Sequence, residues 1–148
     1  MPDTTPLIRL VYVSRAVRDM PLEKVLSLIA KSRTANKARD ITGALLYDRG
    51  LFLQILEGPA GEVERLLASI SRDHRHKDTR VLMREEIADR LFSNWSMGHS
   101  EATLADLAQL PGLNGFFTSG RTVYDMGHPQ LEKVISAFAA GLMRVEQV

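Results

Sequence analysis

Apolar and polar residues follow two different periods over the first hundred residues. Residues 7–14 alternate with period two and are rich in β-branched side chains, which predicts a strand with Tyr12 on one face and Val11 and Val13 on the other. Pro21 stands where a first helical residue is expected. Apolar residues at helical spacing then predict an amphipathic helix reaching to about Asn36, and these residues are Leu22, Val25, Leu26 and Ile29.

A hairpin, a second helix and two more strands are predicted next. Residues 41–47 and 51–57 are almost wholly apolar and are joined by a short turn containing Gly50, a pattern typical of central strands covered on both faces. Residues 63–70 return to helical spacing. Residues 79–87 indicate a fourth strand, and residues 92–98 a weaker fifth.

The order of these elements, β-α-β-β-α-β with one further strand, predicts an α+β, ferredoxin-like fold with two helices on one face of a mostly antiparallel sheet. From about residue 103 the pattern changes to a short helix, turns and a strongly amphipathic helix over 131–142. We expect a domain over residues 5–102 and a C-terminal helical extension over 103–148, which either caps the open sheet face or forms half of a dimer interface. The apolar stripe of the last helix makes a homo-oligomer, a dimer or larger, an expectation.

Composition and charge narrow the range of functions. The 148 residues include no cysteine, which excludes a disulfide scaffold, a thiolate metal site and a cysteine nucleophile. Nineteen basic residues are balanced by 18 acidic ones, so a nucleic-acid partner is not expected. No apolar run approaches the roughly 20 residues that span a bilayer, and the N-terminus lacks the pattern of a signal peptide. We expect a cytoplasmic protein with no membrane partner.

Two polar side chains stand where apolar ones are expected. Gln54 lies in mid-strand, and a buried, unpaired amide would cost about 1–3 kcal/mol, so the site has to contain a side chain, a water or a ligand as its partner. Tyr12 lies in the middle of the first strand, and its hydroxyl also needs a partner when buried. The expected topology makes these strands neighbours, so the two polar groups can meet beneath the helices in a pocket for a flat ligand. The alternatives are a Gln satisfied by backbone or water and a core Tyr whose tip reaches solvent.

The other candidates give weaker signals. The sequence alone assigns no function to Asn36, because Asn is common at helix C-termini. His74 and His76 have no further ligand at zinc spacing, so no metal site is expected. Trp95 and Met97 share a face of the last predicted strand, where core packing is the simplest interpretation.

Taken together, several segments form a specific set. They are Leu-Val-Tyr-Val-Ser at 10–14, Ile-Thr-Gly-Ala-Leu-Leu-Tyr at 41–47, Phe-Leu-Gln-Ile-Leu-Glu-Gly at 52–58, Asp-His-Arg-His at 73–76 and Trp-Ser-Met at 95–97. With Asn36 they resemble the BLUF family of blue-light sensors using flavin, over about residues 7–100. The resemblance implies a stand-alone photosensory protein without an output enzyme. It also implies non-covalent FAD, for which FMN or riboflavin can substitute, bound between the two helices.

The resemblance also implies roles for individual residues. Asn36 would hydrogen-bond the polar edge of the flavin ring, and Gln54 would bridge the ring and the Tyr12 hydroxyl. The rest of the flavin-binding set lies along the ring and its ribityl end and consists of Leu28, Asp73, Arg75 and His76. Outside the matched motifs, Arg33 and Lys37 are candidate phosphate contacts.

The photochemistry that the resemblance implies begins when blue light excites the flavin. Tyr12 then donates an electron, followed by a proton through Gln54, and recombination leaves Gln54 rearranged and the absorption shifted to the red. Rotation and tautomerisation of the Gln54 amide both remain open. Trp95 and Met97 would relay the change to the C-terminal extension and to an unidentified downstream protein, and which of the two faces the flavin is also open.

Three other functions remain open for this topology. An acylphosphatase-like hydrolase needs an Arg after the first strand, for which Arg15 is a candidate, but the glycines of an anion cradle are missing. An RNA-binding module would expose aromatic residues on its central strands. A flavin-free interaction module is the hardest of the three to exclude from the sequence.

Overall fold

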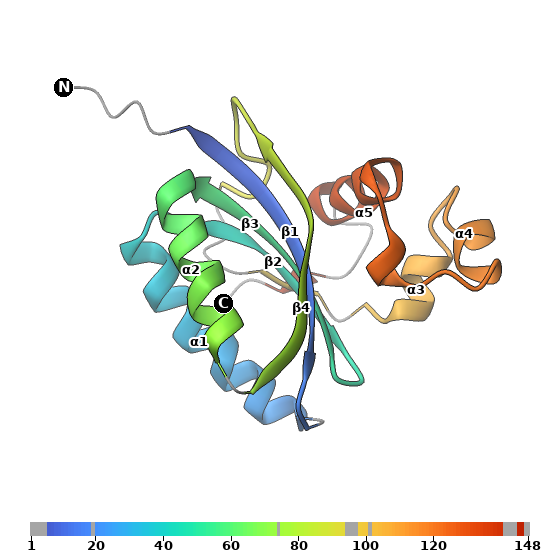
Figure 1. Ribbon diagram of the computed structural model, residues 1–148, viewed down its shortest axis with the longest axis horizontal. Coiled ribbons are helices and arrows are strands. Elements are labelled where there is room, and N and C mark those ends of the chain that lie inside the picture. The colour runs from blue at the N-terminus through green and yellow to red at the C-terminus, as the bar shows by residue number, and fades with distance from the viewer. Residues whose placement is uncertain are drawn as a thin grey trace.

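A mixed sheet runs through the middle of the protein (Figure 1). The structure is a computed structural model that describes residues 6–18, 20–73, 75–93, 98–100, 102–140 and 145–146. The strands are β1 (Leu7–Ala16), β2 (Thr42–Asp48), β3 (Leu51–Pro59), β4 (His76–Glu86), β5 (Gly98–Ser100) and β6 (Val145–Glu146). Their order is β4-β1-β3-β2-β5-β6. The first four strands pair antiparallel, which confirms the ferredoxin-like prediction.

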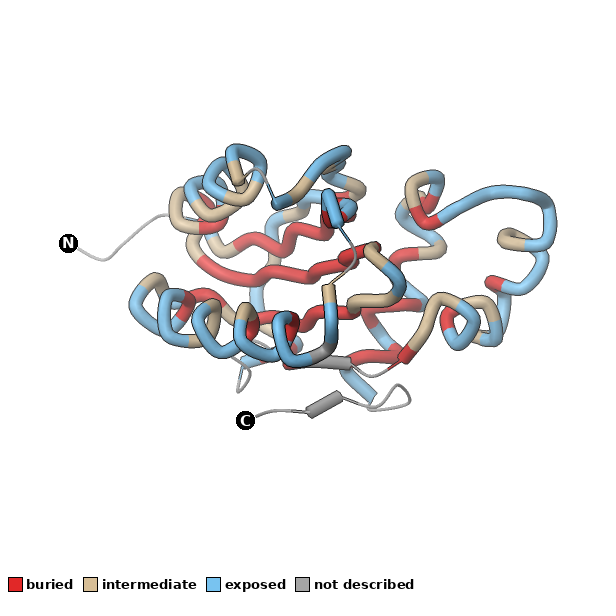
Figure 2. Tube along the Cα trace, turned by 90° about the horizontal axis from the view of Figure 1, so that it is seen from below, coloured by how far each residue is buried: buried red, intermediate tan, exposed pale blue. Residues whose placement is uncertain are grey.

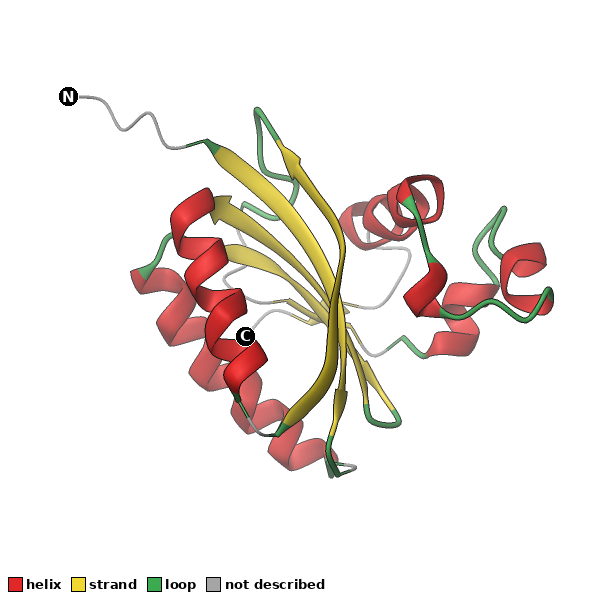
Figure 3. Ribbon diagram, in the orientation of Figure 1, coloured by secondary structure: helices red, strands yellow, loops and turns green. Residues whose placement is uncertain are grey.

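Helices cover both faces of the sheet (Figure 3). The helices α1 (Leu22–Ala38) and α2 (Ala60–Arg72) lie together on one face. The opposite face carries the C-terminal elements, which are α3 (Leu104–Ala108), α4 (Asn114–Thr118), the 3-10 turn η1 (Val123–Asp125) and α5 (His128–Ala140). The strands are therefore the middle layer of three, and buried residues follow them closely (Figure 2).

The two faces of the sheet support two separate hydrophobic cores. Period-two alternation sends Tyr12 and Phe52 into the core beneath α1 and α2, and Val11 and Leu53 into the core beneath the C-terminal helices. This alternation explains why β1 and β3 are apolar almost throughout, since each is covered on both sides.

The C-terminal extension acts as a cap on the second sheet face. Leu131, Val134, Ile135 and Phe138 of α5 are all buried in the same core as the strand residues of that face. The apolar stripe from which we expected a homo-oligomer is thus covered by the chain's own sheet, and a contact between copies would need another surface.

Two strands differ from the sequence prediction. The strand β4 begins at His76 rather than at Thr79, because its outer positions are solvated and carry polar residues that hide the strand pattern. Of the predicted fifth strand over 92–98, residues 92 and 93 lie in no strand, residues 94–97 lie outside the described residues, and Gly98 is in β5, which pairs in parallel with β2. Phe92 is a buried core residue outside any strand. Trp95 and Met97 lie outside the described residues.

A buried carboxylate explains why residues 91 and 92 are not in a strand. The Glu57 side chain, fully buried in β3, accepts hydrogen bonds from the backbone N–H groups of Leu91 and Phe92, so these donors are not available to a neighbouring strand. Arg9 of β1 pairs with the same carboxylate at 2.9 Å and with Glu85 of β4 at 2.9 Å. This Glu57 network ties three strands to the segment that precedes β5.

Two helical predictions also need correction. Leu26, which we placed on the apolar stripe of α1, is 44% exposed, whereas Val25 and Ile29 are buried. The contact of α1 with the core is therefore narrower than the spacing indicated. The helix α4 was not predicted, since residues 111–115 read as a loop and the following segment as turns.

Candidate functional site

Tyr12 and Gln54 face each other across the two central strands. They are direct partners in the antiparallel register of β1 and β3, and the Tyr12 hydroxyl donates a hydrogen bond to Gln54 Oε1. Only 2% of Tyr12 and 7% of Gln54 is exposed. The prediction that these two polar groups meet beneath the helices is confirmed, and each is the partner that the other needs when buried.

Burial also controls the protonation of this pair. Desolvation raises the pKa of the Tyr12 phenol well above its ordinary value, because the charged phenolate is disfavoured away from water. The phenol is therefore neutral throughout the physiological range and always has a proton to donate. An amide carries an acceptor oxygen and a donor NH₂ group, so it can meet a phenol in either orientation.

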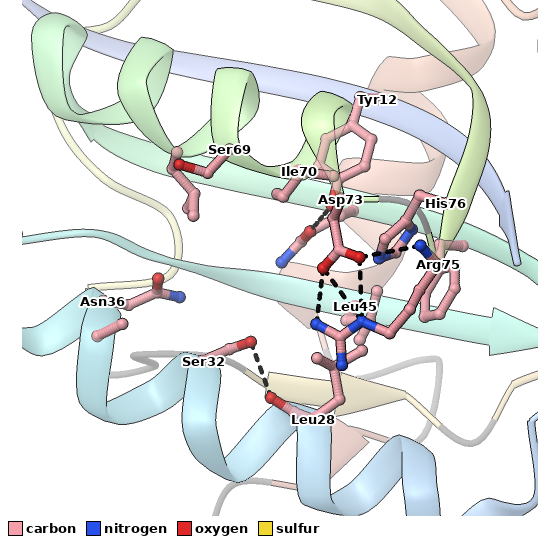
Figure 4. A pocket seen from close by; sticks show the side chains of 14 residues that line it. Tyr12, Leu28, Ser32, Asn36, Leu45, Ser69, Ile70, Asp73, Arg75 and His76 are labelled. Atoms are coloured by element: carbon pink, nitrogen blue, oxygen red, sulfur yellow. Dashed lines mark hydrogen bonds and ion pairs between the residues drawn. The ribbon is translucent and has the colours of Figure 1, made fainter.

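A pocket of about 180 Å³ opens above this pair, between α1 and α2 (Figure 4). Its floor is formed by side chains of the strands, which are Tyr12, Leu45, Phe52 and Gln54. One wall is a stripe of α1 at helical spacing and consists of Leu28, Ser32, Ala35 and Asn36. The other wall is a matching stripe at the end of α2 and consists of Leu66, Ser69, Ile70 and Asp73. A mostly apolar space between two helices, with a few polar groups, suits a planar, hydrogen-bonding ligand.

An ion pair forms one side of the pocket mouth. Asp73 follows α2 directly, and both of its carboxylate oxygens accept hydrogen bonds from the Arg75 guanidinium, the shortest at 2.6 Å. The Arg75 backbone N–H donates to the same carboxylate at 2.9 Å. These hydrogen bonds from Arg75 hold the pKa of Asp73 well below its usual value, so the pair stays charged in the physiological range.

His76 is fixed at the junction of the pocket and β4. Its Nδ1 lies 3.1 Å from the Ser14 hydroxyl, and its ring lies against Phe52 with centroids 4.8 Å apart. Burial lowers the pKa of His76, so the imidazole is neutral near pH 7. The residue thus contributes a neutral ring to the pocket rather than a charge.

The structure brings every predicted flavin-binding residue to this pocket. Leu28, Asn36, Asp73, Arg75 and His76 all line it together with Tyr12 and Gln54. Arg33 and Lys37, our candidate phosphate contacts, line neither this pocket nor the groove beside it. Trp95 and Met97 belong to a segment outside the described residues.

Sequence reasoning missed the small polar residues of the pocket walls. Ser32 lies four residues before Asn36, and Ser69 lies four residues before Asp73. The signal was present, because helix positions three or four residues apart share a face. Small side chains beside two candidate site residues indicate a wall that leaves room for a ligand.

The described residues contain neither a candidate metal site nor a candidate membrane span. These residues contain no group of three or more His, Asp or Glu side chains that could hold a metal ion. Within the described ranges, no helix has both the length and the apolar character needed to traverse a bilayer.

A comparison with protein families identifies the chain. The family described as sensors of blue light using FAD matches residues 7–98, which include the strand pair, both helices and the pocket. The chain belongs to the BLUF family. It is therefore a blue-light sensor that uses FAD, and the pocket between α1 and α2 lies within the matched residues.

Curated relatives carry the BLUF sequence as a small part of larger proteins. Over 107 residues the chain is 37% identical to the photoactivated adenylate cyclase subunit alpha of Euglena gracilis, a match that covers 72% of this chain and 10% of that protein. It is 25% identical over 141 residues to the blue light- and temperature-regulated antirepressor BluF of Escherichia coli, covering 95% of this chain and 34% of that protein. The chain thus spans about a tenth of the cyclase and a third of the antirepressor.

Solved structures agree on the fold. The dark-state structure of BlrB, a BLUF protein, matches with a TM-score of 0.75 and 28% identity, over 94% of this chain and 99% of that one. The structure of a bacterial light-regulated adenylyl cyclase matches with a TM-score of 0.65 and 34% identity, over 91% of this chain and 40% of that one. The likeness extends beyond residue 98, so it includes much of the C-terminal extension.

The geometry also argues against the other functions considered for this topology. Tyr12 and Phe52 are each only 2% exposed, so they offer no surface on which RNA bases could stack. Arg15, the candidate anion ligand of a hydrolase, lies over the Tyr124 ring of the C-terminal cap at 5.5 Å and is not part of the pocket.

Proposed function

We propose that Tyr12 and Gln54 are the photochemical residues of this BLUF protein, with the flavin ring bound in the pocket above them. The observation that carries the proposal is the hydrogen bond from the Tyr12 hydroxyl to Gln54 Oε1 on the floor of that pocket. An oxidisable phenol, an amide that can reverse its orientation and a mostly apolar space are then adjacent.

The residues of the pocket fit a flavin ring. Leu28 and Ile70 supply apolar contacts from opposite walls, and the Asn36 and Gln54 amides can donate to and accept from the polar side of the ring. Asp73 and Arg75 lie at the mouth, where they suit the ribityl chain. When bound, the flavin supplies blue-light absorption and a ring that accepts an electron and a proton.

The proposed switch is a change in the hydrogen bond between two side chains. Tyr12 loses an electron, and its hydroxyl proton leaves along the hydrogen bond to Gln54 Oε1. When electron and proton return, the Gln54 amide is left reversed or tautomerised, so that a donor group points at the Tyr12 oxygen in place of the acceptor. One exchanged hydrogen bond is worth about 0.5–1.5 kcal/mol, enough to shift an equilibrium roughly tenfold without unfolding the domain.

The output of the protein is the second part of the proposal. We infer that residues 5–102 sense light and that the extension over 103–148 passes the change to a downstream protein, without catalysis by this chain. Support comes from the shared core of α5 and the sheet, since Phe138 and Leu53 lie in the same cluster. Trp95 and Met97 remain our candidates for the relay. A homo-oligomer would have to form through a surface other than the buried stripe of α5.

Difference spectroscopy tests the photochemical residues. We expect the purified protein to be yellow and its absorption band to shift to longer wavelength under blue light and return in the dark. Tyr12→Phe keeps the packing and the colour but removes the proton and the electron donor, so the shift is lost. Tyr124→Phe, in the cap and outside the pocket, is the matched control and keeps the shift. A normal photocycle in Tyr12→Phe would contradict the proposal.

A further inference from the structure

The chain turns sharply where α1 ends, directly behind one polar residue of the pocket wall. The backbone carbonyl of Asn36 accepts hydrogen bonds from the N–H groups of Arg39 at 3.1 Å and Ile41 at 2.9 Å. The Asn36 side chain is only 1% exposed and lines the pocket (Figure 4). We call residues 36–42 the α1–β2 corner. The position of the Asn36 amide therefore depends on how firmly this corner is held.

The backbone of the α1–β2 corner is strained at Asp40. Its φ of 58° lies in the left-handed region, which favours glycine and which Asp adopts at a cost. Strained backbone of this kind persists where the surrounding contacts fix it. The Asp40 side chain is 78% exposed, so burial of that side chain does not hold the corner. A contact from elsewhere in the chain has to do so.

Arg90, in the segment after β4, supplies this contact. Its Nη2 donates to the Asp40 carbonyl oxygen at 2.7 Å, and its Nη1 donates to the Thr42 hydroxyl at 3.0 Å and to the Glu57 carbonyl oxygen at 3.1 Å. The same Nη2 lies 3.1 Å from an Asp40 carboxylate oxygen. The Arg90 side chain is only 14% exposed. The planar fork of the guanidinium thus joins the corner to β3.

The base of the Arg90 side chain is also fixed. The two residues that follow Arg90 donate their backbone N–H groups to the buried Glu57 carboxylate. Next to Glu57, Gly58 lets the corner lie close against β3, because a Cβ there would be 3.0 Å from the Asp40 carbonyl oxygen. Arg90 is therefore held on the strand side and grips the corner on the other.

We propose that Arg90 is a positioning residue for the flavin site, which it serves by holding the α1–β2 corner and, through it, the Asn36 amide. The proposal rests on the proposed function of the pocket. Arg90 does not line the pocket, so it acts through Asn36 and not by contact with the ligand. Without Arg90 the corner loosens, and ordering the Asn36 amide when the flavin binds then reduces the affinity.

A purely structural role of Arg90 makes a different prediction. It would lower the stability of the fold but leave the affinity of the folded protein for flavin unchanged, with or without the Asn36 amide. Arg84 offers a matched control, because it is an arginine of the preceding strand that pairs with Glu64 on the surface at 2.7 Å and does not line the pocket.

A double-mutant cycle on the flavin-free protein tests the proposal, with quenching of riboflavin fluorescence as the readout. We expect Asn36→Ala to raise the Kd for riboflavin about tenfold and Arg90→Gln to raise it about three- to fivefold. The double variant should bind no more weakly than Asn36→Ala alone, because Arg90 acts through the amide that is already lost. FMN and FAD should show the same ratios, since the change concerns the ring that all three share. Arg84→Gln should leave every Kd unchanged.

Hydrogen exchange supplies a readout that needs no flavin. We expect the Ile41 N–H, which is bonded to the Asn36 carbonyl, to exchange faster in flavin-free Arg90→Gln than in the wild-type protein. Arg84→Gln should leave this rate unchanged. If Arg90→Gln does not fold, Arg90→Lys takes its place, because it keeps the charge but loses the fork, and the same changes are expected at smaller size.

The possible failures are distinguishable. An unchanged riboflavin Kd in Arg90→Gln, or a further rise when Arg90→Gln is added to Asn36→Ala, overturns the positioning role and leaves the pocket as proposed. An unchanged exchange rate of the Ile41 N–H overturns it as well. Failure of the wild-type protein to bind riboflavin, or an unchanged Kd in Asn36→Ala, instead contradicts the proposed function of the pocket and of Asn36 in it.

Discussion

Among single residues, Gly43 belongs to the family motif at 41–47. Close packing of the backbone, rather than contact with a ligand, explains why this position is a glycine. A Cβ at this position would overlap the carbonyl oxygen of Ile55 on the paired strand, next to Gln54. Only glycine allows β2 to approach β3 this closely. The motif therefore secures the position of the strand that carries the photochemical amide.

Replacement of Gly43 tests this close approach. We expect Gly43→Ala to lower the free energy of unfolding by about 1–3 kcal/mol, because the strands must separate to admit the methyl group. Gly61→Ala is the matched control, because a Cβ there meets nothing within 4 Å and alanine favours the α2 helix. Urea denaturation measures both, and equal stability of the two variants would contradict the explanation.

His76 predicts a pH dependence of stability. Burial lowers its pKa in the folded state, with Asp73 opposing and Arg75 adding to that effect, so the folded protein resists protonation more than the unfolded chain does. The stability that the buried, neutral His76 contributes is therefore complete above the unfolded pKa of about 6.5, and it is lost as the pH falls below that value. We expect the wild-type protein to lose more stability between pH 7.5 and pH 5.5 than His76→Gln does. Thermal melts at the two pH values measure the difference, and parallel losses would rule out His76 as the cause.

The part of the site on paired strands could be predicted from the sequence, whereas the part formed by a helix and a loop could not. Tyr12 and Gln54 were recognisable because polar residues interrupt apolar strands, and period two with the expected strand order made them neighbours. The hollow that adjoins the pocket along α1 could not be predicted in the same way. It combines a helix face with Val17 and Arg18 from the segment after β1, and no periodicity relates such positions.

At the level of elements, α5 is the part whose role the structure decides most clearly. Its stripe could have served a dimer or a cap, and the sequence does not distinguish them because both bury the same residues. The structure shows Phe138 fully buried against the sheet of its own chain. The central strands were predicted well because both of their faces are apolar. The start of β4 was missed because much of that strand is exposed to solvent and carries polar residues.

Truncation of Phe138 measures the contribution of the cap. We expect Phe138→Ala to cost about 3–5 kcal/mol, from lost burial and the cavity it leaves. Ser136→Ala, at an exposed position of the same helix, should change stability by less than about 0.5 kcal/mol. Denaturant unfolding is the measurement. A small effect of Phe138→Ala would mean that the cap contributes little to the fold.

On the scale of the whole molecule, the Glu57 network connects parts that the hydrophobic cores keep apart. Glu57 and Gln54 belong to the same strand, and Arg9 and Tyr12 belong to its neighbour. Glu85 continues the network to His128 at the start of α5, at 3.5 Å. Polar contacts therefore run from the strands of the photochemical pair to the cap on the opposite face.

Removal of the buried charge tests this network. We expect Glu57→Gln to lower stability by about 3–5 kcal/mol, because Arg9 loses its buried partner and the Leu91 and Phe92 N–H groups lose their anionic acceptor. Glu86→Gln is the control, since that side chain is exposed at the end of β4. Chemical denaturation of the two variants should separate them clearly, and similar stabilities would show that the network is not a structural requirement.

The position of β4 at one end of the sheet has a consequence for solubility. An outermost strand offers unpaired backbone groups to which another chain could add. Here the register of β4 with β1 is irregular at two points, and Lys77, Arg80 and Arg84 are exposed along it. Charges and irregular pairing both discourage edge-to-edge aggregation, so this strand is protected whether or not the chromophore is bound.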